Sequence, residues 1–388
     1  MRIRRATLAM LASLTCVSAV AGAAGPASAA EVAPGAPMHL FPPIPAEVPQ
    51  EIPTEVFTQY CSQGVPGTVI LPDGSRKDVM VTAGHCLWGI EGVAEIDPEV
   101  YAPLREGRQL IAVRDQGRAV HPALDDRDPE ELRLMYDGDD WATADLVEGV
   151  EMTRVADSVD QFGQSHGEPV VLTGVRDYTD LEPWDVSFDN LGQPICKDGQ
   201  TSGRTCGVQV LRSSNGLWYL GLALGGDSGG VNFDPQTGEA LGVTSMSVYG
   251  VVGRAQPLDV ALEKAYGIPD GQVNDYFALP DSTAEHSDML TLSESEAVSR
   301  EWAVDTLTQE MATPEEAAAV TQANAETAAE ELYGLAEDSV SAIIENPGQT
   351  ETILQNAEST ADSLESLAHD TADTVLEAGL GTALQQLS

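Results

Sequence analysis

Basic residues are scarce in this sequence. Its 388 residues include 19 Lys and Arg against 62 Asp and Glu, which gives a formal net charge of −43. So acidic a chain repels the phosphates of nucleic acids and the head groups of anionic membranes. We therefore expect neither a nucleic acid nor an anionic membrane surface as a partner.

Long apolar runs are missing after the first 30 residues. No later segment has the roughly 20 apolar residues that a membrane-spanning helix needs. Residues 1–30 combine an Arg-rich start, an apolar stretch and the small-residue run Ala27-Ser28-Ala29, which is the pattern of a secretory signal peptide. An uncleaved membrane anchor is the alternative. We expect the signal peptide to be removed, leaving a secreted protein that is either free outside the cell or associated with the cell surface.

The most informative stretch that is present is Gly226-Asp227-Ser228-Gly229-Gly230. A serine between an acidic residue and paired glycines can lie on a tight turn, because no Cβ keeps neighbouring N–H groups from converging on one point. Acyl transfer needs such an exposed hydroxyl together with preorganised donors for the oxyanion. An ordinary glycine-rich loop is the alternative for this stretch taken alone.

A second stretch, Thr82-Ala83-Gly84-His85-Cys86, ends an apolar run with a histidine that can accept and return a proton near neutral pH. Together the two stretches resemble the chymotrypsin-like serine peptidases, in which TAGHC carries the general base and GDSGG the nucleophile. The run CKDGQTSGRTCG at residues 196–207 narrows the resemblance to the bacterial streptogrisin and α-lytic group. The resemblance covers roughly residues 56–268.

The resemblance implies a secreted serine endopeptidase with Ser228 as nucleophile and His85 as general base. A carboxylate should orient the imidazole. We assign this role to Asp140, because the following run 141–144 can continue as a strand that buries it, and Asp139 is the second choice. We expect no cofactor and no metal. The other histidines lie in no comparable motif and are expected at the surface: His39, His121, His166, His286 and His369.

The resemblance also implies how the loop around the nucleophile is supported. The backbone N–H groups of Gly226 and Ser228 would form the oxyanion hole. Asp227 would be neutralised by Lys197, the residue directly after the first cysteine of the third motif, where the resembling group usually has Arg. An exposed Lys197 is the alternative.

Cysteine is sparse as well, with five residues in the chain. Signal removal would leave four, an even number that suits an oxidising compartment and that allows three pairings. Sequence proximity and the resemblance together favour the disulfides Cys61–Cys86 and Cys196–Cys206. A metal site is less favoured, because no second histidine lies near either pair and the spacings are not those of zinc sites.

The substrate pocket follows from the resemblance too. One wall would consist of Leu222, Ala223 and Leu224, and the other of Ser245, Met246 and Ser247. Leu222 stands where trypsin-like enzymes carry Asp, which favours apolar or small side chains before the scissile bond over Lys or Arg. Ser245 would steady Asp140, and Ser247 stands where glycine is usual.

The chain is expected to fold in several parts. Residues 31–55 contain seven prolines and are interpreted as a linker or strap. Short β-branched runs separated by turn residues fill residues 56–279 and predict an all-β sandwich or barrel. The resemblance selects two six-stranded antiparallel β-barrels, with the active site between them and a closing C-terminal helix at 257–267.

A linker over 280–292 and an acidic Ala- and Glu-rich helical region over 293–388 are expected to follow. From residue 281 onward there is one basic residue, Arg300, against 23 acids. Apolar residues at helical spacing predict a separate small all-α bundle or hairpin, with capping boxes at 293–296 and 313–316, a break at 346–348 and an end at Gly379. A partly disordered tail is the alternative.

Two functions are thus open at this point. The first is a serine peptidase acting on protein or peptide substrates, with a tail that contacts the peptidase itself or the cell wall. The second is a catalytically quiet surface protein that binds a partner on a peptidase scaffold. The intact set of motifs favours the first, because a pseudoenzyme usually shows damage in one of them.

Overall fold

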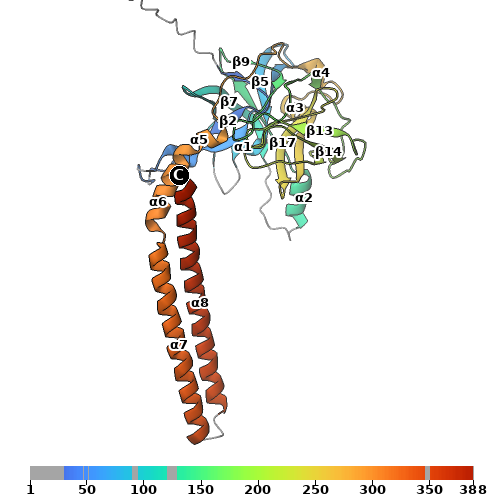
Figure 1. Cartoon of the computed structure of the whole chain (residues 1–388). Helices are drawn as coiled ribbons and strands as arrows, with labels where there is room; N and C mark the ends of the chain where they lie inside the picture. The colour runs from blue at the N-terminus through green and yellow to red at the C-terminus, as the bar shows by residue number, and fades with distance from the viewer. Residues whose placement is uncertain are drawn as a thin grey trace, which may run out of the picture.

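The computed structural model of the protein describes residues 30–46, 48–50, 52–89, 95–119, 129–345 and 350–387. The expected signal peptide and the expected helix break at 346–348 therefore lie, nearly or wholly, outside the described residues. Figure 1 shows a β-rich body from which two long helices project side by side. In the described part of the chain, no helix is long and apolar enough to cross a membrane.

An eight-stranded sheet forms one half of the body, in the order β19-β4-β5-β8-β7-β6-β2-β3. Its strand pairings do not close on themselves within the described residues, so one of the two barrels predicted from the sequence is not confirmed. Its strands are β2 (Pro37–Leu40), β3 (Gln59–Ser62), β4 (Val65–Ile70), β5 (Arg76–Thr82), β6 (Glu99–Leu104), β7 (Gly107–Ala119), β8 (Asp140–Leu146) and β19 (Phe277–Ala278).

Six strands of the other half close into a barrel. The order β17-β16-β13-β14-β15-β18 returns to β17, because β17 also pairs with β18. Helix α3 (Leu258–Tyr266) follows and ends at Gly267 in the left-handed conformation, as expected for the closing helix. The barrel, the other sheet and this helix fit the trypsin-like fold expected from the sequence. The barrel strands are β13 (Pro194–Lys197), β14 (Thr205–Arg212), β15 (Leu217–Leu220), β16 (Val231–Phe233), β17 (Glu239–Val248) and β18 (Val252–Pro257), and β12 (Gly174–Val175) adds to β17.

One apolar cluster joins the two halves. Val65 and Val81 of the open sheet pack with Val231 and Val243 of the barrel and with Leu258 of α3, and all five are fully buried. The two halves of the body therefore share a core.

Residues 31–55 were expected as a linker or strap, and the linker interpretation is wrong for their first part, which adds strands to the sheets of the body. Strand β1 (Glu31–Val32) pairs with β9 (Glu151–Met152), and β2 pairs with β3 and β6. Met38 and Leu40 are fully buried. Proline is tolerated as the first residue of a strand, where Pro37 stands, so a proline-rich composition did not exclude a core position. A short 3₁₀ helix, η1 (Thr54–Phe57), precedes β3.

The prediction of a linker over residues 280–292 was also wrong. The backbone N–H of Arg154 donates to the Ser282 carbonyl (3.1 Å), and that of Leu290 donates to the Pro103 carbonyl (2.8 Å). Met289 is 8% exposed and belongs to the core of the open sheet. This segment is therefore part of the body.

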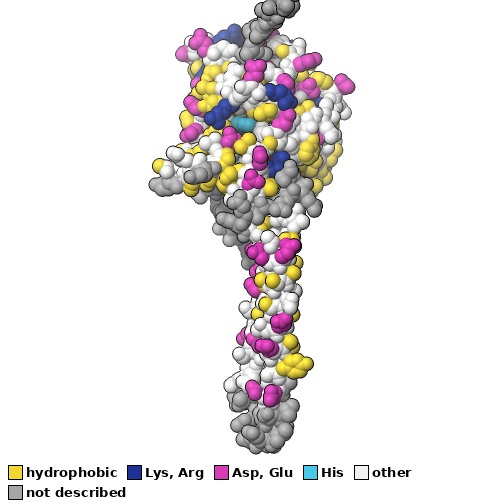
Figure 2. Space-filling view, turned by 60° about the vertical axis from the view of Figure 1, so that its left-hand side comes forward, with side chains coloured by type: hydrophobic (Ala, Val, Ile, Leu, Met, Phe, Trp, Pro, Cys, Tyr) yellow, Lys and Arg dark blue, Asp and Glu magenta, His cyan; other side chains and the backbone are white. Residues whose placement is uncertain are grey.

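The tail is helical, as expected. It consists of α5 (Leu292–Ser295), α6 (Ala297–Glu310), α7 (Pro314–Glu345) and α8 (Thr350–Leu387), and α7 and α8 pack along each other. Figure 2 shows acidic side chains along this hairpin. The capping box at Thr313 and Glu316 is present, whereas the earlier one forms at Thr291 and Glu294, two residues before the predicted position.

Helix α8 continues past Gly379, where the sequence predicted its end. A glycine inside a helix costs about 1 kcal/mol, which the long packed interface with α7 outweighs. Near the end of α8, a Cβ built on Gly381 would stand 3.5 Å from Met311, so the C-terminal end of the hairpin lies back at its root.

Two buried titratable groups make the stability depend on pH in opposite directions. Burial raises the pKa of Asp259 to about 7, although the N–H of Tyr178 donates to this carboxylate (2.6 Å). Burial, with Arg108, lowers the pKa of His39 to about 4. His39 was expected at the surface and is in fact 8% exposed; His166 and His369 are exposed, His286 is half-buried, and His121 lies outside the described residues.

We expect Asp259→Asn to stabilise the protein increasingly as the pH rises. The raised pKa means that the folded protein binds a proton that the unfolded chain releases near its ordinary value, so Asp259 costs about 2–3 kcal/mol of stability between pH 5 and pH 8. His39 has the opposite effect, because its lowered pKa makes the protein less stable as the pH falls below about 6.5. Urea unfolding of Ser228→Ala with and without Asp259→Asn, at pH 5 and pH 8, isolates the Asp259 contribution.

The matched control is Gln236→Ala, because Gln236 is exposed and its side chain does not titrate. Its effect on the free energy of unfolding should stay nearly constant between the two pH values. A pH-independent effect of Asp259→Asn would show that the carboxylate is already ionised in the folded protein at pH 5.

Candidate active site

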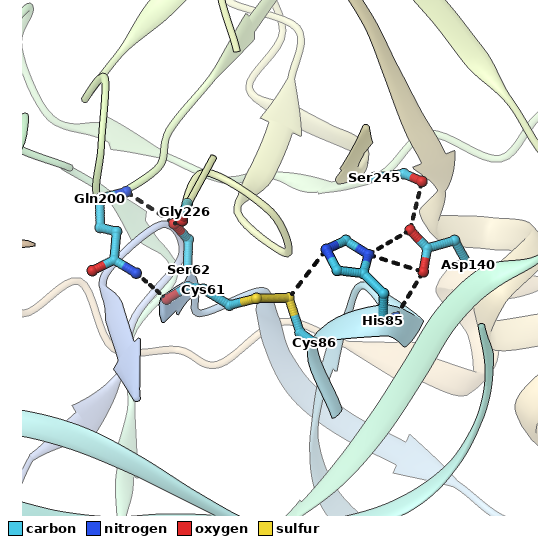
Figure 3. Close-up of a disulfide and its surroundings, with 8 residues drawn as sticks. All are labelled: Cys61, Ser62, His85, Cys86, Asp140, Gln200, Gly226 and Ser245. Atoms are coloured by element: carbon cyan, nitrogen blue, oxygen red, sulfur yellow. Dashed lines mark hydrogen bonds and ion pairs between the residues drawn. A yellow bond between two sulfur atoms is a disulfide. The ribbon is translucent and has the colours of Figure 1, made fainter. Parts of the chain in front are cut away.

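His85 lies on the short helix α1 (Gly84–Trp88), directly after β5. Only glycine fits before it, because a Cβ on Gly84 would stand 2.2 Å from the Arg118 carbonyl oxygen. His85 is 7% exposed, and its Nδ1 lies 2.9 Å from Oδ2 of Asp140. Its backbone N–H also donates to Oδ1 of Asp140 (2.8 Å), so one carboxylate orients both the ring and the helix (Figure 3).

Asp140 is 2% exposed at the start of β8. The Ser245 hydroxyl donates to its Oδ2 (2.6 Å), and its own N–H donates to Oε1 of Gln256 (3.0 Å). The neighbouring Asp139 instead pairs with Lys264 (2.5 Å). The structure therefore brings Asp140, and not Asp139, against the imidazole.

The surroundings of His85 raise its pKa. Burial alone would lower the pKa of the imidazole, but the charge and hydrogen bond of Asp140 outweigh it and hold the pKa above its ordinary value. With Nδ1 donating to Asp140, Nε2 is the nitrogen that can accept a proton from a nucleophile.

Ser228 lies on a loop that backbone hydrogen bonds attach to β3 and to β17. The Ser62 N–H donates to the Ser228 carbonyl (2.7 Å), and the Gly229 N–H donates to the Thr244 carbonyl (2.7 Å). Thr244 precedes Ser245, the residue that donates to Asp140. Gly229 has a φ of 84°, and a Cβ there would stand 2.3 Å from Oγ1 of Thr82, so this position requires glycine.

A disulfide connects β3, which is bonded to the Ser228 loop, to α1, which carries His85. Cys61 precedes Ser62, Cys86 follows His85, and the two cysteines are bonded. Nε2 of His85 lies 3.8 Å from Sγ of Cys86. No hydrogen bond joins Ser228 Oγ to the imidazole among the described residues. Catalytic hydrogen bonds are often long before substrate binds and tighten in the Michaelis complex.

The loop also holds two unused backbone donors. The N–H groups of Asp227, Gly229 and Gly230 donate to carbonyls within the chain. Those of Gly226 and Ser228 have no acceptor in the part of the chain that the structure describes. Gly226 has a φ of 92°, which favours glycine. These are the two donors that the sequence assigned to an oxyanion hole.

A buried ion pair anchors the loop from behind. Nζ of Lys197 lies 2.9 Å from Oδ2 of Asp227, and these side chains are 1% and 0% exposed. Asp227 also accepts from the N–H groups of Leu224, Thr201 and Ser202 and from the Ser202 hydroxyl. Burial lowers the pKa of Lys197, and the charge of Asp227 opposes this shift. Lys197 is therefore not the exposed residue of the alternative interpretation.

The second disulfide, Cys196–Cys206, joins β13 to β14 beside Lys197. Both disulfides expected from the sequence are thus present. The group Cys61, His85 and Cys86 is close enough to share a metal, but the two sulfurs are bonded to each other and are not thiolates.

A second group of side chains close enough to share a metal lies among the described residues, and all of its members are acidic. Asp177, Glu263 and Asp270 have carboxylate oxygens within 4.8 Å of one another. None of them belongs to the His85–Asp140–Ser228 set. They are half-buried or exposed, as acidic residues without a ligand often are.

The expected pocket walls are hydrogen-bonded to each other. The Ser247 hydroxyl donates to the Ala223 carbonyl (2.8 Å), and the Ala223 N–H donates to the Gly250 carbonyl (3.1 Å). Ala223 is buried, whereas Leu222 and Leu224 are 42% and 38% exposed. Ser245 is buried and Met246 half-buried. A serine at position 247 thus places a hydroxyl where glycine would leave open space.

Arg254 of β18 is a residue that the sequence did not reveal. It is 2% exposed; its Nη1 donates to the Ser245 hydroxyl (3.0 Å) and its Nη2 to the Asn215 carbonyl (2.8 Å). Because the Ser245 oxygen accepts from Arg254, its own proton is left to point at Asp140. Burial lowers the pKa of Arg254. No motif surrounds this arginine, so only the fold reveals its place.

No protein-family model matches this sequence, and no curated protein matches it. Similar solved structures are bacterial chymotrypsin-like serine proteases. Protease A of Thermobifida fusca is 18% identical over 61% of this chain and 96% of its own, with a TM-score of 0.38. The Nocardiopsis protease NAPase is 17% identical over 61% and 97% (TM-score 0.37). Cellulomonas bogoriensis chymotrypsin is 18% identical over 65% and 100% (TM-score 0.36).

Proposed function

We propose that this protein is a secreted serine endopeptidase that cleaves protein or peptide substrates through an acyl-enzyme on Ser228. The observation that carries the proposal is the buried Asp140–His85 pair beside the Ser228 loop, whose N–H groups at 226 and 228 have no acceptor among the described residues. A base oriented by a carboxylate, next to a serine with spare backbone donors, is what acyl transfer requires.

The proposed reaction has two stages, acylation of Ser228 and hydrolysis of the acyl-enzyme. Ser228 Oγ bonds to the substrate carbonyl carbon while its proton passes to Nε2 of His85. The carbonyl oxygen becomes negatively charged, and the N–H groups of Gly226 and Ser228 donate hydrogen bonds to it. The C–N bond breaks as Nε2 returns the proton to the leaving amine. Water then attacks the acyl-enzyme with His85 again as base, releasing the acid and restoring Ser228.

The pocket walls support cleavage after apolar or small residues. Leu222 and Leu224 offer apolar surface, and no acidic side chain stands at the Leu222 position to pair with Lys or Arg. The Ser247–Ala223 hydrogen bond fills part of the space between the walls. A digest of a peptide library should therefore show small or apolar residues before the cut sites.

The export proposal has support of its own. The first 30 residues have the pattern of a signal peptide, and two disulfides join β3 to α1 and β13 to β14. Disulfides persist in oxidising compartments outside the cytosol.

A fluorophosphonate probe tests the proposed activity. It bonds to a serine that a neighbouring base activates, so it should label the native protein and leave Ser228→Ala unlabelled. Ser75→Ala is the matched control, because Ser75 lies on the exposed turn between β4 and β5 and its loss should not change labelling.

Two outcomes would contradict the proposal. Labelling that persists in Ser228→Ala would show that another residue reacts with the probe and that Ser228 is not the nucleophile. A folded, disulfide-bonded native protein that takes up no probe and cleaves no peptide would favour a catalytically quiet binding protein.

A further inference from the structure

The first helix of the tail lies against the candidate oxyanion loop. Leu292 begins α5 and is 6% exposed. Its Cδ2 lies 3.7 Å from the position that a Cβ on Gly226 would occupy. The residue that provides one of the two unused N–H donors therefore has a tail side chain as its neighbour.

Hydrogen bonds tie α5 to this loop through two intermediates. The Ser293 N–H donates to the Gln161 carbonyl (3.2 Å), and the Gln161 N–H donates to the Thr201 carbonyl (2.9 Å). The Thr201 hydroxyl then donates to the Gly225 carbonyl (2.7 Å). On its other side α5 reaches β3, where the Tyr60 hydroxyl donates to the Ser295 carbonyl (3.5 Å).

These contacts lie on the side of the site where a leaving group would pass. Nε2 of His85 must protonate the leaving amine, so the residues after the scissile bond leave past this atom. Nε2 lies beside the Cys61–Cys86 disulfide, and Tyr60 precedes Cys61 (Figure 3). The expected pocket wall of the acyl side instead contains Ser245, whose hydroxyl donates to Asp140.

The segment that carries Leu292 is fixed to the body. Arg105 bonds both Asp288 (2.8 Å) and Glu294 (2.9 Å), and Thr291 and Glu294 form a capping box. Met289 is buried in the core of the open sheet. Leu292 is the α5 side chain that lies beside Gly226. The buried Met289, the capping box and the Arg105 pairs hold its segment against the body.

We propose that α5 forms the leaving-group wall of the cleft and that Leu292 is a specificity-determining residue, which contacts apolar side chains directly after the scissile bond. This inference rests on the proposed peptidase function. It assigns the tail a role in substrate recognition, since the first tail helix packs beside Gly226 of the candidate oxyanion loop.

Acyl transfer to an added amine tests this wall separately from the acyl pocket. N-acetylalanine p-nitrophenyl ester acylates Ser228 without supplying any residue after the scissile bond, and leucinamide or glycinamide then competes with water for the acyl-enzyme. In the unmodified protein leucinamide should be the better acceptor. Leu292→Ala should lower the aminolysis-to-hydrolysis ratio for leucinamide about tenfold, toward that for glycinamide, with hydrolysis by water unchanged.

The matched control is Leu332→Ala, which makes the same change at an exposed position on α7. Its ratio should equal that of the unmodified protein. An unchanged ratio in Leu292→Ala, or an equal fall in Leu332→Ala, would overturn the proposal. Failure of the unmodified protein to release p-nitrophenol would instead reject the peptidase function, because that step precedes any contact with the acceptor.

Discussion

Asparagine in place of Asp140 should lower kcat/KM about 10⁴-fold while the protein stays folded. The carboxylate accepts both the Nδ1 proton and the backbone N–H of His85, and it accepts the Ser245 hydroxyl proton as well. An amide can present its NH₂ group to Nδ1, which would turn the imidazole into the tautomer that carries its proton on Nε2. That tautomer cannot accept the serine proton. Steady-state hydrolysis of a peptide taken from the library digest measures the loss.

Asp139→Asn provides the matched control, because it makes the same change one residue away. Asp139 pairs with Lys264 and Arg118 and does not contact the imidazole. We expect its kcat/KM to stay within about threefold of the parent, since isolated surface pairs contribute about 1 kcal/mol or less. Equal losses in the two variants would mean that Asp140 acts through the fold and not through His85.

Methionine in place of Lys197 should destabilise the protein by about 3–5 kcal/mol and lower kcat as well. Removing the ammonium leaves the Asp227 carboxylate fully buried without its cation, and breaking a buried pair from one side typically costs this much. Asp227 also receives four other hydrogen bonds that shape the loop before Ser228, so the strain should reach the oxyanion donors. Urea unfolding in the Ser228→Ala background measures the stability, and turnover in the active protein measures kcat.

Two variants sharpen this experiment. Lys197→Arg keeps the charge and should retain most of the stability. Lys264→Met breaks a pair whose lysine is 38% exposed and should cost less than about 1 kcal/mol. A loss in Lys197→Met no larger than that in Lys264→Met would show that water or another group compensates Asp227.

Short motifs predicted the site better than composition predicted the limits of the body. The contacts of His85 with Asp140 and of Lys197 with Asp227 could be expected from the resemblance that the motifs carry, although each joins residues distant in sequence. The burial of Met38–Leu40 and of Met289 could not, since no motif marks either segment and both depend on partners distant in sequence. Amino-acid composition indicates whether a segment can fold by itself. These two segments are ordered because they pair or pack with strands of the body.

Arg254 and Leu292 show the same limit within the site. A single arginine in a strand and a leucine at a helix start carry no pattern that sets them apart. Each acquires its place only when β18 closes the barrel beside Ser245 or when α5 docks beside Gly226. The roles of Ser228, of the two backbone donors and of the pocket walls remain predictions that the experiments above address.

The hairpin of α7 and α8 is long enough to act as a spacer. Helix α8 has 38 residues, and at 1.5 Å per residue it extends about 57 Å from a root at which Gly381 meets Met311. The N-terminal end of α8 lies away from the body (Figure 1). A partner bound at that end of α8 would hold the body several nanometres from the surface to which the partner is attached.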